Sequence, residues 1–169
     1  MPFSMSWIWR AGCIEESMSF HLKVDGFEDE ATVPSRFTCE GDNAPPSLRW
    51  SGPPEGTRSF AVVLDDPDAP AGTFTHWLLW NIPADVHSLR TGYTASGAVR
   101  TGTNDFGKAA YGGPCPPKGH GPHRYYFSLY ALDVDFLDVP DGASRAELEP
   151  ALDRHAIGTV KCVGRFERK

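Results

Sequence analysis

The stretch Leu64–Trp77, LDDPDAPAGTFTHW, ends one apolar run in aspartates and begins the next with a histidine. The runs at 58–66 and 76–82 each have the length and composition of a buried β-strand. Asp and Pro are favoured in turns, so the Asp-Pro-Asp segment predicts that the chain reverses between the two strands. Sequential strands with a short connection usually pair antiparallel, which would place Asp66 and His76 close together at one rim of a sheet.

Polar residues stand at the ends of apolar rows in three predicted strands. Side chains two residues apart share one face of a strand. This alternation predicts the rows Phe60, Val62, Leu64, Asp66 and His76, Leu78, Trp80, Ile82. The segment 123–133 is apolar on both faces, which is typical of a central strand, and it begins with His123. The sequence therefore predicts one acid and two imidazoles at strand ends.

The length and composition indicate one β-rich domain. The chain has 169 residues, 12% aromatic residues, 15 Pro and 17 Gly, with short apolar runs between turn signals. We expect a disordered N-terminal extension at 1–17 and the folded domain at 18–169. Further strands are expected at 19–24, 35–39, 47–51 and 159–166, and a long irregular loop at 91–122.

Charge and cysteine usage exclude several classes of protein. The formal net charge is −6 and the chain has no Lys/Arg cluster, which argues against nucleic-acid binding. No apolar run approaches the length of a transmembrane segment, about 20 residues. The cysteines at 13, 39, 115 and 162 form no C-x-x-C pair and no export signal is convincing, so we expect reduced, mostly buried thiols in a cytoplasmic protein.

One helix is predicted near the C-terminus. Ser144 followed by Glu147 forms a capping-box pattern, and Leu148 and Leu152 would line the buried face. Pro150 removes a backbone donor and should kink or shorten this helix. We expect Gly158 to end it before the last strand.

Four separated motifs resemble the phosphatidylethanolamine-binding protein (PEBP) family. They are DPDAP at 66–70, HWLLWNIP at 76–83, YGGPCPPKG at 111–119 and PHRYYFSLYALD at 122–133. The segment 37–70 is also similar to the bacterial and archaeal branch of that family, which is called Raf-kinase-inhibitor-like. The resemblance extends from about 19 to 168, in the expected order of motifs.

This resemblance implies a mainly β fold of two antiparallel sheets of Greek-key type, with one or two short helices and an anion pocket at one rim. The implied ligand-binding residues are Asp66, Asp68, His76, His123, Gly113, Pro114, Pro116 and Tyr125. The sequence departs from the family pattern in two places. Phe74 replaces a common Trp, and the C-terminal helix that helps close the pocket in animal members cannot be carried over. We therefore expect a more open pocket or a different ligand.

The site residues suggest a binding mechanism. A carboxylate neighbour favours the cationic form of a histidine, and an imidazolium is a good donor to an anion. We expect His76 and His123 to face a phosphate, a carboxylate or a phosphoethanolamine-like head group. Asp66 and Asp68 would orient the two imidazoles, and one aspartate could face the ammonium of a zwitterion. No cofactor is expected.

Three alternatives stay open at this stage. Two His and two Asp could ligate a metal, although no local ligand pair such as H-x-x-x-H is present. The chain could be a regulatory protein that inhibits a kinase or protease, and a homodimer is compatible with the sequence. It could also be an Asp/His-dependent hydrolase, but Ser128 and Cys115 are weak candidates for a nucleophile. An enzyme is the less favoured class.

Overall fold

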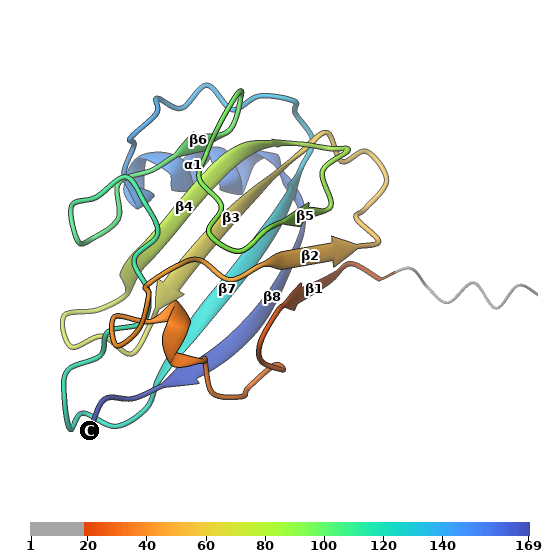
Figure 1. Cartoon of the computed structure of the whole chain (residues 1–169). Helices are drawn as coiled ribbons and strands as arrows, with labels where there is room; N and C mark the ends of the chain where they lie inside the picture. The colour runs from red at the N-terminus through yellow and green to blue at the C-terminus, as the bar shows by residue number, and fades with distance from the viewer. Residues whose placement is uncertain (1–18) are drawn as a thin grey trace, which may run out of the picture.

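The computed structural model describes residues 19–169, which form two antiparallel sheets and one α-helix (Figure 1). The predicted extension at 1–17 and Cys13 lie outside the described residues. The large sheet has the strand order β6-β4-β3-β7-β8 and the small sheet the order β1-β2-β5. This architecture confirms the predicted mainly β fold.

The strands agree in most places with the apolar runs of the sequence. Those of the large sheet are β3 (Ser59–Asp66), β4 (Phe74–Pro83), β6 (Arg100–Thr101), β7 (His123–Leu132) and β8 (Ala156–Phe166). Those of the small sheet are β1 (His21–Val24), β2 (Leu48–Ser51) and β5 (Ser88–Leu89). A strand predicted at 35–39 is wrong: Ser35–Phe37 form the 3-10 turn η1, which follows Pro34 and closes a bond from Phe37 N–H to the Pro34 carbonyl (3.0 Å).

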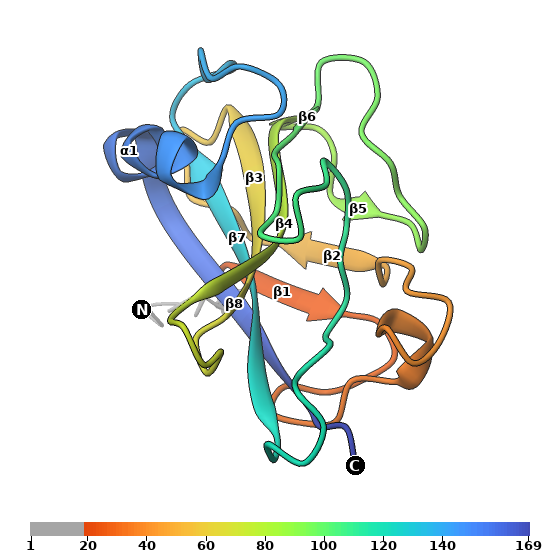
Figure 2. The same ribbon diagram turned by 90° about the vertical axis from the view of Figure 1, so that its left-hand side faces the viewer.

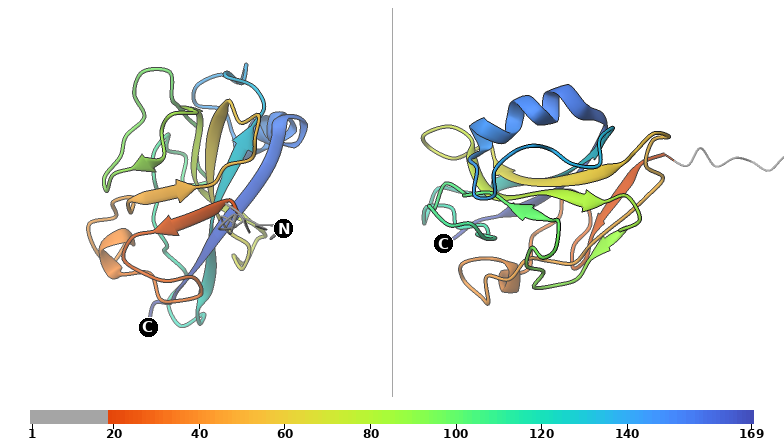
Figure 3. Two further views of the ribbon diagram at one scale, coloured as in Figure 1. Left: turned by 90° about the vertical axis from the view of Figure 1, so that its right-hand side faces the viewer. Right: turned by 90° about the horizontal axis from the view of Figure 1, so that it is seen from above.

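Two apolar cores lie on opposite faces of the large sheet. Between the sheets, Phe60, Val62 and Leu64 of β3 pack with Leu48 and Trp50 of β2 and their neighbours. On the other face, Ala61 and Val63 pack under α1 (Arg145–His155). Figure 3 shows α1 covering one face of the large sheet while the small sheet covers the other. Burial on both faces explains why β3 and β7 are the central strands.

The predicted row of His76, Leu78, Trp80 and Ile82 is wrong, because β4 does not alternate regularly. Leu78 and Trp80 face α1, whereas Ile82 joins the core between the sheets. The change of face occurs at Asn81, which has φ +59° and pairs with the backbone of Leu137 through both ends of its amide. Such a bulge places one extra residue in a strand and turns the next side chain to the opposite face.

The helix confirms its predicted start but not its predicted end. Ser144 and Glu147 form the capping box, and Leu148 and Leu152 are buried. The helix continues past Pro150 to His155, so the predicted shortening does not occur. Gly158 lies inside β8, which begins directly at Ala156, and therefore does not end the helix. Within residues 19–169, no helix has the length and apolar character needed to cross a bilayer.

The prediction of reduced cysteines is wrong for Cys39 and Cys115, which form a disulfide with Cα atoms 5.4 Å apart. The fold brings the end of η1 against the loop 111–119, where Cys39 N–H donates to the Pro114 carbonyl (3.1 Å). A pair separated by 76 positions leaves no local pattern in the sequence. Cys162 is a buried free thiol, as expected. The bonded Cys115 is unavailable as a nucleophile while the disulfide is intact.

Candidate functional site

The end of β3 and the starts of β4 and β7 meet at one rim of the large sheet (Figure 2). Asp66 lies opposite Phe74, and Asp65 lies opposite Tyr126, because both neighbours of β3 run antiparallel to it. The rim therefore gathers Asp66, His76 and His123. The turn predicts that the first two lie together, and the start of the strand at 123 predicts the third.

Asp66 forms a buried pair with His123. The Nδ1–H of His123 donates to Oδ2 of Asp66 at 2.7 Å, and the two side chains are 2% and 4% exposed. The other carboxylate oxygen of Asp66 accepts the backbone N–H of Asp68 at 2.8 Å. These bonds hold the carboxylate and place a proton on Nδ1 of His123, which leaves Nε2 on the other side of the ring.

His120 is hydrogen-bonded to Nε2, the second ring nitrogen of His123. Its Nδ1 lies 2.6 Å from Nε2 of His123, so one proton is shared between the two rings. The side chain of His120 is exposed and stands in a loop between Gly119 and Gly121, both with positive φ and open space around them. An anion that binds to Nε2 of His123 has to displace this imidazole.

A bulge in β4 directs His76 into the site. Asp65 pairs with Thr75 and Leu64 pairs with Trp77, which leaves His76 as the extra residue. Its Nδ1–H donates to the Gly112 carbonyl at 2.8 Å, so Nε2 carries the lone pair of the neutral ring. Burial lowers the pKa of His76, although the bond to Gly112 and the charge of Asp66 oppose this shift. The expected cationic His76 is therefore corrected to a neutral one.

This lowered pKa predicts that acid destabilises the fold through His76. The unfolded chain takes up a proton near the ordinary histidine value, about 6.5, while the folded chain resists it. Stability is therefore present above that value and falls as the pH is lowered from 7 to 5. We expect His76→Gln, which can keep the bond to Gly112, to show a smaller loss over this range. Urea unfolding at both pH values measures it, and equal losses in the two proteins would contradict the assignment.

Asp68 does not orient an imidazole, contrary to the prediction. Its carboxylate binds Arg124 through the Nε–H and Nη2–H groups and the backbone N–H (3.0, 2.8 and 2.8 Å). The side-chain hydrogen bond from Arg124 lowers the pKa of Asp68 to about 2. Through these bonds to Arg124, the residue that follows His123, Asp68 fixes the start of β7.

Tyr125 lies behind the two histidines. Its ring packs edge-on against His76 at 5.4 Å and nearly parallel to His123 at 6.5 Å between centroids. The side chain is fully buried, and among the described residues its hydroxyl has no hydrogen-bond partner. Burial raises its pKa well above the ordinary tyrosine value, so it stays protonated and remains a donor. A buried donor without a partner is costly. The negative charge of the Asp66 carboxylate close to this hydroxyl adds to the rise in the pKa of Tyr125.

The loop 111–119 lies against η1 and the segment after it. Gly113 N–H donates to Oδ1 of Asn43 (2.8 Å), and a Cβ at Gly113 would collide with the Phe37 carbonyl. The Pro116 carbonyl accepts a bond from Arg168 Nε–H at 2.6 Å. Gly113, Pro114 and Pro116 are buried and hold the loop in place, while the contact with His76 comes from Gly112. Gly112 is therefore a site residue that the motif-based prediction missed.

The polar residues of the rim are almost fully buried. Asp66, His76 and His123 are 3%, 3% and 2% exposed. Within residues 19–169, no group of three or more His, Cys, Asp or Glu side chains is arranged to hold a metal ion. The two aspartates diverge, since Asp66 binds His123 and Asp68 binds Arg124, and this separates the set proposed as metal ligands.

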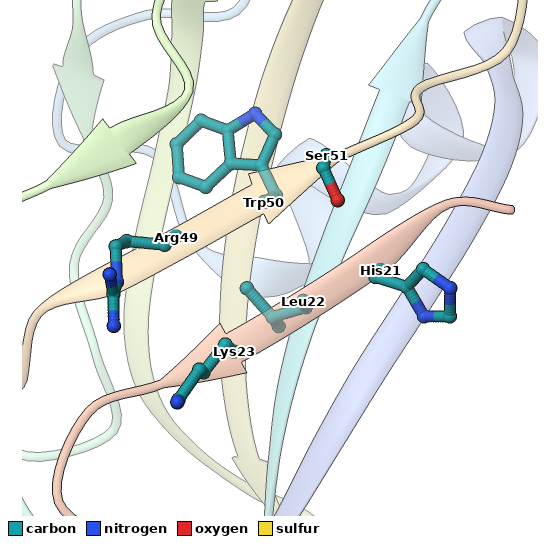
Figure 4. A pocket seen from close by; sticks show the side chains of 6 residues that line it. All are labelled: His21, Leu22, Lys23, Arg49, Trp50 and Ser51. Atoms are coloured by element: carbon teal, nitrogen blue, oxygen red, sulfur yellow. The ribbon is translucent and has the colours of Figure 1, made fainter. Parts of the chain in front are cut away.

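A separate hollow of about 300 Å³ lies on the small sheet (Figure 4). It is lined by His21, Leu22, Lys23, Arg49, Trp50 and Ser51. Arg49 already pairs with Asp25 at 2.8 Å, on a solvent-exposed surface. This hollow does not include any of the predicted site residues, and we assign no function to it.

The fold and the rim define a two-sheet β protein with a buried acid–imidazole site at the end of its large sheet. The profile of the phosphatidylethanolamine-binding protein family matches residues 23–167. The chain belongs to this family, as the sequence motifs predict.

Relatives support the bacterial and archaeal branch. The chain is 46% identical over 168 residues to the UPF0098 protein of Pyrococcus horikoshii, covering 94% of this chain and 83% of that one. It is 44% identical over 142 residues to UPF0098 protein YbcL of Escherichia coli, covering 80% and 78%. The crystal structure of YbcL superimposes with a TM-score of 0.84 at 37% identity, covering 89% and 99%. LppC of Mycobacterium tuberculosis, a candidate lipoprotein by name, is 40% identical over 141 residues, covering 83% and 69%.

His120 was not predicted as part of the site, although its spacing to His123 is visible in the sequence. The pattern H-x-x-H spans a loop and the first residue of a strand, so neither helical nor strand periodicity brings its two rings together. Arg124, which follows His123 in the sequence, forms an ion pair with Asp68.

Proposed function

We propose that this protein binds a small oxyanion, either a phosphate, a carboxylate or the head group of a phospholipid, at the rim formed by Asp66, His76 and His123. The observation that carries the proposal is the buried Tyr125, whose hydroxyl forms no hydrogen bond within the described residues and whose ring packs against the imidazoles of His76 and His123. An oxyanion is the ligand that satisfies such a donor, because its oxygens only accept.

The histidines have distinct roles in this proposal. His123 donates from Nε2 after His120 has moved away, and Asp66 stabilises the imidazolium that results. His76 accepts a proton at Nε2 as the anion enters, or accepts a bond from a protonated phosphate oxygen. Anion binding therefore favours protonation of the site, and affinity should rise as the pH falls.

The state of the cysteines indicates the cellular compartment in which the protein acts. A cytoplasmic location was expected because the cysteines form no C-x-x-C pair and no export signal is convincing, but the Cys39–Cys115 disulfide favours an oxidising compartment. We therefore propose that the protein acts where disulfides persist.

The variant Tyr125→Phe separates binding from folding. It removes the unpartnered hydroxyl and keeps the packed ring, so we expect the free energy of unfolding to rise by about 1 kcal/mol. Affinity for phosphate should fall roughly ten- to hundred-fold, because a hydrogen bond to a charged group is lost. Isothermal titration calorimetry with phosphate and with phosphoethanolamine measures the affinity, and urea unfolding measures the stability.

The control for this variant is Tyr130→Phe, on the same strand but packed against the core under α1. It should leave phosphate affinity unchanged. If Tyr125→Phe bound phosphate as tightly as the unaltered protein, or if the unaltered protein bound neither anion, the proposed site would be wrong.

A further inference from the structure

The Cys39–Cys115 disulfide lies at the protein surface and next to the candidate site. Cys39 is exposed and Cys115 is half-buried, so a thiol in solution can reach the bond. Cys115 stands in the loop 111–119, three positions after Gly112, whose carbonyl accepts the Nδ1–H of His76. Exposed disulfides are the ones that undergo thiol–disulfide exchange most readily. The bond that holds this loop is therefore one that a reductant can open.

Hydrogen bonds tie the two ends of the loop 111–119 to the large sheet. Near its start, Gly112 N–H donates to the His76 carbonyl at 3.0 Å. Near its end, the Pro116 carbonyl accepts the Nε–H of Arg168, which follows the end of β8 (2.6 Å). The middle of the loop is held from another part of the chain.

The middle of the loop lies against the segment that follows η1, which belongs to neither sheet. Gly113 N–H donates to Oδ1 of Asn43 at 2.8 Å, and Cys39 N–H donates to the Pro114 carbonyl at 3.1 Å. Such hydrogen bonds contribute little net stability where water competes for the same groups. The disulfide joins the two segments covalently, and its reduction would leave this contact to weak bonds at the surface.

Cys115 also borders the buried tyrosine of the site. Burial raises the pKa of Tyr125, and the backbone N–H of Cys115 opposes this rise, which places the N–H beside the tyrosine hydroxyl. Movement of the loop after reduction would therefore disturb the surroundings of Tyr125 and the bond from His76 to Gly112 together. A site that is already ordered binds more tightly, because no ordering cost is subtracted from the binding energy.

The third cysteine of the described residues does not take part in exchange. Cys162 is 5% exposed and packs in the core between the sheets. Burial raises the pKa of its thiol to about 11. The thiolate is the attacking species in disulfide exchange, so a buried thiol with a high pKa is inert. Within residues 19–169, the redox chemistry is therefore confined to one bond.

We propose that the Cys39–Cys115 disulfide is a redox switch of the anion site, so that the oxidised protein binds its anion and the reduced protein releases it. This proposal rests on the proposed anion site and adds a form of regulation to it. The bond is positioned for this role because it is accessible from solvent and fixes the loop that contacts His76.

The reductant in this proposal is a dithiol. One of its thiolates attacks Sγ of the exposed Cys39, which breaks the S–S bond, and Cys115 leaves as a thiolate that takes up a proton. The second thiol of the reductant then displaces Cys39 from the mixed disulfide. In total, two electrons and two protons pass to the two cysteines, and the dithiol becomes a disulfide.

The test measures the affinity of the full chain for inorganic phosphate by isothermal titration calorimetry, before and after reduction with dithiothreitol. This dithiol is uncharged and does not compete for an oxyanion site. We expect reduction to weaken binding roughly ten-fold, because only about a tenth of the molecules then hold the loop in the binding conformation. Reoxidation should restore the affinity. The double variant Cys39→Ser/Cys115→Ser should bind as weakly as the reduced protein and should not respond to dithiothreitol, although it keeps Cys13 and Cys162.

A second variant tests the loop itself. Asn43→Gly removes the acceptor of Gly113 N–H, and glycine tolerates the φ of +54° at this position. We expect at most a two-fold loss of phosphate affinity in the oxidised variant, and a further loss of about three-fold beyond that of the unaltered protein after reduction. Hydrogen exchange supplies a readout without ligand: the Gly113 amide should exchange faster after reduction, while the amides of β3 and β7 keep their rates.

Leu152→Ala is the control for a general loss of stability. Leu152 is buried under α1, on the opposite face of the large sheet from the disulfide, and its truncation leaves a cavity. This variant should bind phosphate as tightly as the unaltered protein and should show the same response to dithiothreitol. A loss of affinity in Leu152→Ala as large as that on reduction would show that stability, and not the loop, controls binding.

The remaining outcomes separate the switch from the anion site. If the reduced protein stays folded and binds phosphate as tightly as the oxidised protein, the switch is wrong and the anion site stands. If the reduced protein loses its fold, the disulfide has a purely structural role and the switch is again wrong. If the oxidised protein does not bind phosphate, both proposals are wrong.

Discussion

Loss of the Cys39–Cys115 disulfide is expected to lower the free energy of unfolding by about 2–5 kcal/mol, the range for native disulfides. The bond closes a loop across 76 positions, and cross-linking such distant residues restricts the unfolded chain strongly. It also joins η1 to the loop that supplies Gly112 to His76. The double variant Cys39→Ser/Cys115→Ser, unfolded in urea, measures the effect.

Reductant provides the control for this prediction. It should destabilise the unaltered protein to a similar extent and have no effect on the double variant, in which Cys162 is kept. A non-reduced digest should contain a linked peptide pair with Cys39 and Cys115. Urea curves that coincide with and without reductant would show that the two thiols are not bonded in solution.

Replacement of Asp66 by alanine should destabilise the fold by about 3 kcal/mol, the lower end of the range for breaking a buried ion pair. The lower end applies because His123 keeps its hydrogen bond to His120 when the Asp66 carboxylate is removed. The variant also leaves the backbone N–H of Asp68 without its acceptor, since Oδ1 of Asp66 is lost. Urea unfolding at pH 7 measures this change.

Asp68→Ala is the matched control for the Asp66 variant. Asp68 is 29% exposed and pairs with Arg124 at the surface, where an ion pair contributes about 1 kcal/mol or less. We therefore expect a clearly smaller loss than for Asp66→Ala. Equal losses in the two variants would contradict the assignment of Asp66 as the buried anchor of the rim.

The sequence predicted the central part of the fold because local patterns determine it. The apolar runs at β3, β4 and β7 and the capping box at Ser144 are visible in short windows. The turn between β3 and β4 brings Asp66 and His76 to one rim through antiparallel pairing alone. The strand pattern also predicts His123 at the start of β7, and the family motifs then add Tyr125, which alternation places on the same face.

What the sequence could not predict depends on irregular backbone and distant contacts. The bulge at His76 changes which face each side chain of β4 takes, and no residue type signals it. Asp66 binds His123 rather than His76 because the bulge and the Gly112 carbonyl hold His76 in a different bond. The disulfide and the His120–His123 contact each join loop residues whose position is set only by the complete fold.

The anion site is tested most directly by an amide NMR titration of the metal-free full chain with phosphate. We predict saturable shifts that cluster at residues 66–76 and 112–125, with the largest changes near His120 and Tyr125, where the ligand displaces one ring and meets a free hydroxyl. Absence of shifts there, or weak shifts spread over the surface that do not saturate, would contradict an oxyanion site at this rim.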